Sequence, residues 1–269
     1  MPGFQSKYSN DVAVLKDYAG RGCKLTIHKS IRNPGWEDDE PLFKGEKGAV
    51  NDEKLMENII HARSRIFELA YCNPWTYFTT FTIDKKKCGR YDLEKYHKAF
   101  AQWLRNYNKK HEIQIKYLTI PEQHKDGAWH EHGFIMGLPV EHLRLFNPEV
   151  EKLPKYITEK VLGGSLVYDF PAYREKFGFC DFEPIRSVEG VSKYVTKYIS
   201  KNLAKSVTEV NAHLYYCSQG LQRATEIKRG TMSANMEPDF ENEYVKVKWY
   251  NTSAVLDALS NCIHDYSKK

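Results

Sequence analysis

The pattern of apolar and polar positions predicts a chain in which helices and strands are mixed. Apolar residues recur at helical spacing from residue 51 to just before Asn73, and again from Asp92 to Tyr107. Runs rich in β-branched and aromatic residues, which are typical of buried strands, cover residues 75–83, 113–120 and 129–136. A polar turn between the last two runs lets them pair as a hairpin. The central part of the chain is therefore β-α-β-β, preceded by one more helix.

Outside this central part the pattern is less regular. The sequence predicts further strands and helices toward both ends, with strands at residues 24–31, 214–218 and 244–249 and helices at 187–205 and 253–263. Residues 140–186 contain four prolines and show no sustained periodicity. We therefore expect this segment to be mostly loop.

The composition is that of an ordinary globular protein. Hydrophobic residues make up 41% and charged residues 28% of the chain, which argues against intrinsic disorder. No apolar run approaches the roughly 18 residues of a membrane helix, and the first residues lack the basic-then-apolar pattern of a secretory signal. The six cysteines form no CxxC pair, which disfavours a zinc ribbon. We therefore expect a cytoplasmic protein.

Charge and aromatic content allow a nucleic-acid partner without requiring one. Lysine and arginine number 40 against 35 aspartates and glutamates, a net charge of +5. The 18 tyrosines are more suggestive. Proteins bind single strands by stacking bases on aromatic rings and neutralising the backbone with basic side chains.

The most distinctive motif is a pair of histidines in the last strand of the predicted hairpin. Side chains alternate along a strand, so His130 and His132 project from one face and Glu131 from the other. Glu122, at the end of the preceding strand, would face the same side as the two histidines. Two imidazoles and one carboxylate with open coordination positions are a set that binds a divalent ion.

Two alternatives stay open for this motif. Gln123 or His124 could take the place of Glu122 as the third ligand. Two histidines spaced in this way also occur on protein surfaces where they bind nothing.

A second motif lies in the helix predicted after the loop-rich segment. Tyr194 and Tyr198 are four residues apart and share a helix face, while Lys193, Lys197 and Lys201 form a second row. An amphipathic helix with tyrosines in the core and lysines in water would show the same pattern. A tyrosine hydroxyl is a weak nucleophile, so a reactive one needs a metal ion or a lysine charge nearby.

Taken together, the motifs resemble those of the HUH endonucleases, which initiate rolling-circle replication of phages and plasmids. FTTFTID resembles the first motif of that family, Glu122 with WHEHGFIMG resembles the histidine motif, and YVTKYISK resembles the tyrosine motif. The resemblance runs from about residue 75 to residue 205, and CSQGL adds a weaker match. The doubled tyrosine is similar to the two-tyrosine branch, typified by the initiators of small single-stranded DNA phages.

The resemblance implies a fold and a domain organisation. The fold class would be α+β, with a central antiparallel β-sheet, helices on one face in an HUH- or RRM-like arrangement, and the site on the opposite face. Residues 71–225 would form the endonuclease domain. Residues 1–70 would be an N-terminal extension with a strand and a helix, and residues 226–269 a C-terminal extension packed on the same domain.

The resemblance also implies an activity, namely site-specific nicking and religation of single-stranded DNA through a 5′-phosphotyrosine intermediate. A divalent metal, Mn²⁺ or Mg²⁺, would be bound by His130, His132 and Glu122. The remaining roles would fall on the second motif, with Tyr194, Tyr198 and Lys197 as catalytic residues and Lys193 and Lys201 as DNA-binding residues.

The implied partner is a single-stranded DNA origin in a bacterial host cell. The chain has no GxxxxGK[ST] motif, so we expect a separate helicase and a separate DNA polymerase. A non-catalytic single-stranded nucleic-acid-binding protein of RRM-like fold is the alternative. A metal-dependent hydrolase that uses the histidines without covalent catalysis is the third possibility.

One position departs from the pattern of that family. The middle residue of the histidine motif is usually apolar because it faces the core, whereas here it is Glu131. We expect this face of the strand to meet either water or a basic partner.

Overall fold

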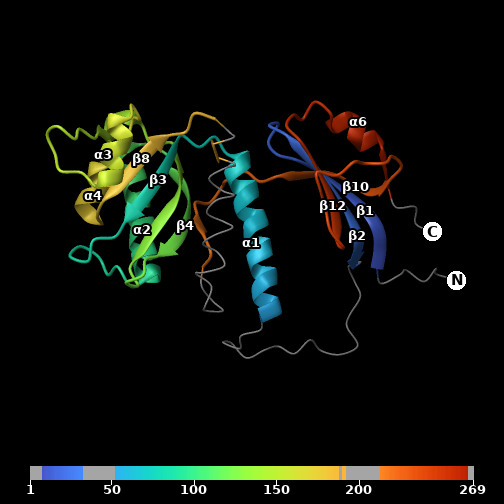
Figure 1. Ribbon diagram of the computed structural model, residues 1–269, viewed down its shortest axis with the longest axis horizontal. Helices are drawn as coiled ribbons and strands as arrows, with labels where there is room; N and C mark the ends of the chain where they lie inside the picture. Colours follow the sequence, from blue (N-terminus) through green and yellow to red (C-terminus); the bar gives the residue numbers. More distant parts are fainter. Residues whose placement is uncertain (1–7, 33–51, 188–189, 192–212, 266–269) are drawn as a thin grey trace. The chain divides into compact units, whose positions relative to one another are not determined.

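The chain forms two compact units, each built around a sheet of its own. The computed structural model describes residues 8–32, 52–187, 190–191 and 213–265 (Figure 1). One unit is Gly48–Leu221, and the other combines Met1–Lys47 with Gln222–Lys269. None of the described helices is long and apolar enough to cross a membrane.

The sheet of the first unit is antiparallel and has the order β6-β7-β8-β3-β5-β4-β9. Its strands are β3 (Tyr77–Thr82), β4 (Lys116–Gln123), β5 (Trp129–Met136), β6 (Arg144–Leu145), β7 (Tyr168–Asp169), β8 (Cys180–Pro184) and β9 (Tyr216–Cys217). The predicted hairpin is the pair β4–β5, which lies between β3 and the edge strand β9. The α+β class and the central antiparallel sheet are therefore confirmed.

One face of this sheet carries an aromatic core under helices α2 (Leu93–His111) and α4 (Pro171–Lys176). Phe81 of β3 packs against Phe100 of α2 and Tyr173 of α4, with ring centroids 5.3 and 4.6 Å away. Asp92 caps α2, because its Oδ1 accepts a hydrogen bond of 3.0 Å from the backbone N–H of Lys95. The apolar positions that recur at helical spacing along this helix therefore form the surface that it buries.

The opposite face of the sheet packs against helix α1 (Asp52–Cys72). Ile66 and Leu69 of α1 share a buried cluster with Leu118 of β4 and Phe134 of β5. Side chains alternate between the two faces along a strand, and these strand residues project from the face that is turned away from α2. Helices α2 and α4 lie on one face as expected, and α1 adds a helix on the face opposite to them.

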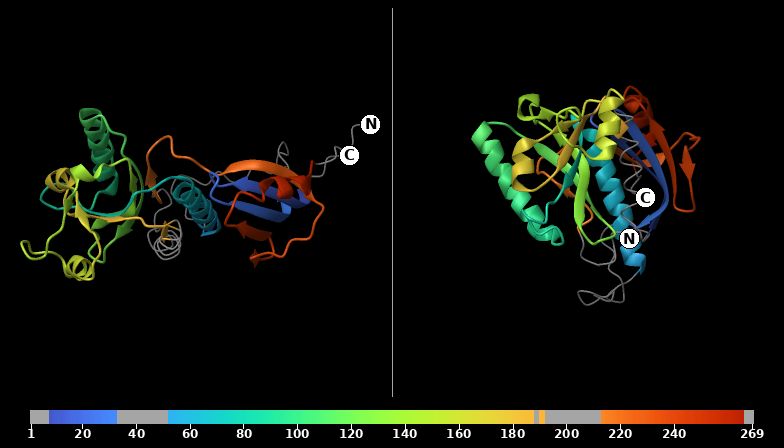
Figure 2. Two further views of the ribbon diagram at one scale, coloured as in Figure 1. Left: turned by 90° about the horizontal axis from the view of Figure 1, so that it is seen from above. Right: turned by 60° about the vertical axis from the view of Figure 1, so that its left-hand side comes forward.

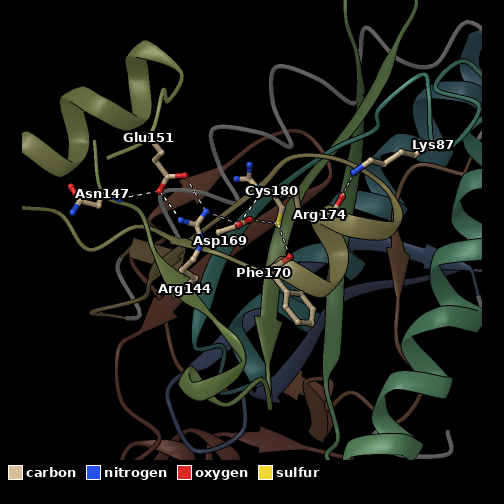
Figure 3. A network of polar contacts seen from close by, with 8 residues as sticks. All are labelled: Lys87, Arg144, Asn147, Glu151, Asp169, Phe170, Arg174 and Cys180. Atoms are coloured by element: carbon tan, nitrogen blue, oxygen red, sulfur yellow. Dashed lines mark hydrogen bonds and ion pairs between the residues drawn. The ribbon is translucent and has the colours of Figure 1, made fainter. Parts of the chain in front are cut away.

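Residues 140–186 are more ordered than their sequence suggests. They contain η1 (Val140–His142), α3 (Lys155–Leu162) and α4, together with strands β6, β7 and β8. Asp169 is the buried centre of this segment, and its carboxylate forms ion pairs with Arg144 at 3.1 Å and with Arg174 at 2.8 Å. The Cys180 thiol donates to the same carboxylate at 3.6 Å (Figure 3). These contacts depend on how the short elements fold onto one another, which local periodicity does not reveal.

The second unit is a six-stranded sheet of order β11-β12-β2-β1-β10-β13, made from both ends of the chain (Figures 1 and 2). Its elements are β1 (Tyr8–Asp17), β2 (Cys23–Arg32), β10 (Thr225–Met232), β11 (Phe240–Glu241), β12 (Val245–Tyr250), α6 (Leu256–Asn261) and β13 (Ile263–His264). Leu15, Leu25 and Ile263 lie at the centre of its core, against which residues of α6 pack.

This organisation differs from the expected one in two ways. The N-terminal and C-terminal segments form one common sheet, through the pairs β1–β10 and β2–β12, instead of two extensions. Helix α1, expected in the N-terminal extension, falls within the unit Gly48–Leu221. Strands β1 and β10 were not predicted, because neither shows a clear alternation of apolar and polar residues.

Candidate metal centre

The β4–β5 hairpin places Glu122, His130 and His132 on one face of the central sheet. Glu122 pairs directly with His130 in the antiparallel register, and His132 follows two residues later. The turn between the strands is closed by a 2.8 Å hydrogen bond from the backbone N–H of His124 to the carbonyl of Ala128. The expected orientation of the two histidines and the glutamate is therefore present.

The three side chains converge on a small volume. Nε2 of His130 and Nε2 of His132 each lie 3.2 Å from the same oxygen, Oε2 of Glu122. One ligand atom from each residue can be chosen so that all three lie within 4.8 Å of one another. The histidines are largely shielded from water, whereas a third of the Glu122 side chain is exposed. Such an arrangement leaves a site that is open on one side.

The electrostatics keep the carboxylate and one imidazole in the forms that bind metal. The pKa of Glu122 is lowered to about 2, above all by the hydrogen bond from His132, so the carboxylate is ionised at neutral pH. The pKa of His130 is lowered to about 4, mainly by burial and then by its electrostatic interaction with the neighbouring His132 and His124. His130 is therefore neutral at pH 7 and has a lone pair to donate.

Neighbouring residues decide which atoms are left for an ion. Oγ1 of Thr80, on β3, lies 3.2 Å from Nδ1 of His132. If the proton of His132 is on Nδ1, this hydrogen bond to Thr80 orients the ring so that Nε2, which lies 3.2 Å from Oε2 of Glu122, is the atom that would bind a metal. Nδ1 of His130 is buried and has no hydrogen-bond partner among the described residues. Two nitrogen donors and one carboxylate oxygen suit a divalent metal ion, so the residues present fit the expected kind of cofactor.

The two alternative ligands lie outside this cluster. The side-chain amide of Gln123 donates to the carbonyl of Gly127, within the hairpin turn, at 3.0 Å. The ring of His124 packs against that of His130, with centroids 4.1 Å apart. Glu122 is therefore the residue that completes the cluster.

Glu131 points to the opposite face and meets a basic partner. Its side chain is fully buried, and Oε1 lies 3.1 Å from Nδ1 of His97 on α2. Nε2 of His97 in turn lies 3.0 Å from the hydroxyl of Tyr117, and the ring of Tyr216 stacks on His97 at 3.6 Å. The sequence indicated two outcomes for this position, water or a basic residue, and the structure has the second.

The tyrosine motif lies outside the described residues. Tyr194, Tyr198, Lys193, Lys197 and Lys201 all fall within residues 192–212. Their roles stay predictions.

The sequence did not indicate how two residues contribute to the site. Thr80 lies in a stretch that is typical of a core strand, and only the pairing of β3 with β5 brings it to His132. Asp181 lies in the segment that we expected to be loop. Asp181 pairs with Thr80 across the β3–β8 ladder, on the side of β3 opposite to β5. Burial raises the pKa of Asp181 to about 6. No periodic signal marks either residue.

Comparison with known proteins gives one match. Residues 76–203 match the family described as replication-associated protein ORF2/G2P. This stretch is just under half of the chain, and it contains the metal cluster as well as both tyrosines of the second motif. No curated protein and no solved structure shows significant similarity to the chain. The family match supports a role in the initiation of replication.

Proposed function

We propose that this protein initiates rolling-circle replication by nicking and rejoining single-stranded DNA through a 5′-phosphotyrosine intermediate. The observation that carries the proposal is the cluster of Glu122, His130 and His132 inside the stretch that matches a replication-associated family. The two-tyrosine motif follows in the same stretch. Strand transfer requires a metal-binding set and a nucleophile, and both candidates occur in this stretch of the sequence.

In the proposed reaction, the metal ligands and the tyrosines have different roles. A divalent ion held by Glu122, His130 and His132 would polarise the scissile phosphate as a Lewis acid. The phenolic oxygen of Tyr194 or Tyr198 loses its proton and attacks the phosphorus. The bond to the 3′ oxygen then breaks, and this oxygen takes up a proton and leaves as a 3′-hydroxyl that can prime synthesis.

The lysines of the tyrosine motif complete the proposed site. Lys197 lies between Tyr194 and Tyr198 in sequence, and its charge would favour the phenolate and the departing oxygen. Lys193 and Lys201 would neutralise phosphates of the bound strand. A second tyrosine allows a second cleavage while the first is still esterified, as closing a displaced circle requires.

The test is a search for a covalent adduct with DNA of random sequence, so that no particular origin has to be chosen. The protein is incubated with a random-sequence pool of single-stranded DNA and Mn²⁺, and the product is denatured in SDS. We expect an adduct that withstands SDS and disappears with EDTA, and sequencing of the trapped strands would give the origin. A protein that only binds single strands gives no adduct, and a hydrolase gives cleavage without one. Either result contradicts the proposal.

A further inference from the structure

The sheet face that carries the metal cluster continues past β3 to β8. Thr80 of β3 pairs with His132 on one side and with Asp181 on the other. Residues that pair directly in antiparallel strands project from the same face, so these three side chains form one row. Neighbouring strands lie about 4.8 Å apart, which puts Asp181 roughly 10 Å from His132. The row leads from the metal cluster to Asp181 on β8, which contacts helix α3.

Helix α3 places an aromatic ring at the far end of this row. The hydroxyl of Tyr156 donates a 3.0 Å hydrogen bond to Oδ2 of Asp181. The Lys160 ammonium lies 5.6 Å from the centroid of the Tyr156 ring and forms an ion pair with Glu183 at 2.6 Å. Even so, Tyr156 is 43% exposed. The ring is therefore fixed in place by its neighbours while part of it stays open to solvent.

The surroundings of this tyrosine make it a poor nucleophile. Burial and the Asp181 carboxylate raise the pKa of the Tyr156 hydroxyl, which therefore stays protonated and acts as a donor. The ring, by contrast, has the properties of a stacking surface. It is held rigid, so stacking a base on it costs little conformational entropy. Lys160 next to it supplies a positive charge for a phosphate.

We propose that Tyr156 and Lys160 form a subsite for one unpaired nucleotide beside the scissile phosphate, with the base stacked on the ring and the phosphate near the ammonium. The inference rests on the proposed function for the identity of the strand. It adds a contact on α3, outside both the metal cluster and the tyrosine motif. Asp181 and Glu183 position the subsite and do not touch the DNA backbone.

Equilibrium binding of fluorescent single-stranded oligonucleotides in EDTA tests the subsite apart from cleavage. Removing the ring with Tyr156→Leu should weaken binding by about 5- to 150-fold, the range for loss of one base–aromatic stack. Tyr156→Phe also loses the bond to Asp181 but keeps the ring, so it should bind close to wild type. Tyr91→Leu, at a tyrosine that is 61% exposed elsewhere in the unit, is the control for a general effect.

Lysine variants on the same helix test the phosphate contact. Lys160→Ala should reduce the dependence of log affinity on log salt by about one unit of slope, as for the loss of one phosphate contact. Lys155→Ala, at a side chain that is 90% exposed and lies 3.7 Å from Glu159 one turn along the helix, should leave the slope unchanged.

Each part of the inference can fail separately from the proposed function. Wild-type affinity in Tyr156→Leu, or an equal loss in Tyr156→Phe, would overturn the stacking role. An unchanged salt slope in Lys160→Ala would overturn the phosphate contact. If binding changes as expected while the wild-type protein forms no adduct with Mn²⁺, the subsite stands and the nicking function falls.

Discussion

At the scale of single residues, the geometry of the metal cluster depends on the identity of three side chains. One carboxylate oxygen of Glu122 contacts both histidines. The Nε2 atoms of His130 and His132 each lie 3.2 Å from it. Their hydrogen bonds hold the histidines where an ion would need them. An ion bound here would replace these hydrogen bonds.

Removal of either histidine tests the cluster directly. We expect His130→Ala and His132→Ala each to lower cleavage by roughly 100-fold or more, because the remaining ligands cannot hold the ion. Binding of single strands in EDTA should be largely retained, because other residues make those contacts. His124→Ala is the matched control, since this ring packs against His130 but lies outside the cluster. Unchanged cleavage in either variant at millimolar Mn²⁺ would remove these histidines from the site.

The two tyrosines can be separated by removing only their hydroxyls. Tyr194→Phe and Tyr198→Phe should each still allow a single cleavage, whereas the double variant should form no adduct. Peptide mapping of the adduct identifies the tyrosine that carries the DNA. If all DNA is found on one tyrosine, and the variant at the other still releases closed circles, the two-tyrosine mechanism is wrong.

Asp181 gives a prediction about pH and stability. Its pKa in the folded protein is raised to about 6, above the ordinary value of 3.8, so the ionised form is disfavoured by folding. The free energy of unfolding therefore falls as pH rises from about 4 to about 6, by up to about 3 kcal/mol. Asp181→Asn removes this penalty. Urea unfolding should show the variant as more stable than wild type at pH 7.5 and similar to it at pH 4, and an equal difference at both pH values would contradict this explanation.

At the scale of elements, α2 and β5 are joined by a polar contact inside an aromatic core. Glu131 of β5 has no access to water, and His97 of α2 is its partner at 3.1 Å. A buried carboxylate is costly unless it is paired. The contact therefore constrains how α2 lies on β5, the strand that carries the two candidate histidine ligands.

Removing one partner of this contact should lower the free energy of unfolding more than removing both partners. His97→Leu leaves the Glu131 carboxylate buried without its partner and should lower the free energy of unfolding by roughly 3–5 kcal/mol. The double variant His97→Leu with Glu131→Leu removes both polar groups and should recover part of that loss. Urea unfolding of the four proteins in the cycle measures the coupling. Additive effects of the two single changes would show that the pair does not act as a unit.

At the scale of the whole molecule, one unit depends on segments from both ends of the chain. Strands β1 and β2 pair with β10 and β12, which lie more than 200 residues later in the chain. The N-terminal strands alone would leave much of their apolar face uncovered, and a two-stranded hairpin is marginally stable in water.

Truncation tests this dependence. A chain that ends at Leu221 should expose Lys16, Lys24 and Lys29 to rapid cleavage by trypsin, because β1 and β2 lose their partners. The unit Gly48–Leu221 should keep its protection, since its own sheet and core remain intact. A chain that ends at residue 265 keeps all described strands and serves as the control. Equal protection of the N-terminal strands in both proteins would show that they are stable without β10 and β12.

The sequence by itself determined how residues that are close together in the chain are oriented. The alternation in Trp129–Met136 fixed His130 and His132 on one face and Glu131 on the other, and the short hairpin brought Glu122 to the histidines. These relations depend only on the two-residue period of a strand and on the pairing of neighbours in the chain, so a pattern a few residues long contains them.

The tertiary structure decided which residues and strands that are remote in the sequence contact each other. The partner of Glu131 comes from α2, Asp181 reaches the site face because β8 pairs with β3, and β1 pairs with β10. Strands such as β8 and β10 carry little periodic signal, and their register is fixed by packing and hydrogen bonding with strands remote in sequence. Such choices depend on the complementarity of whole surfaces, which no short segment of sequence contains.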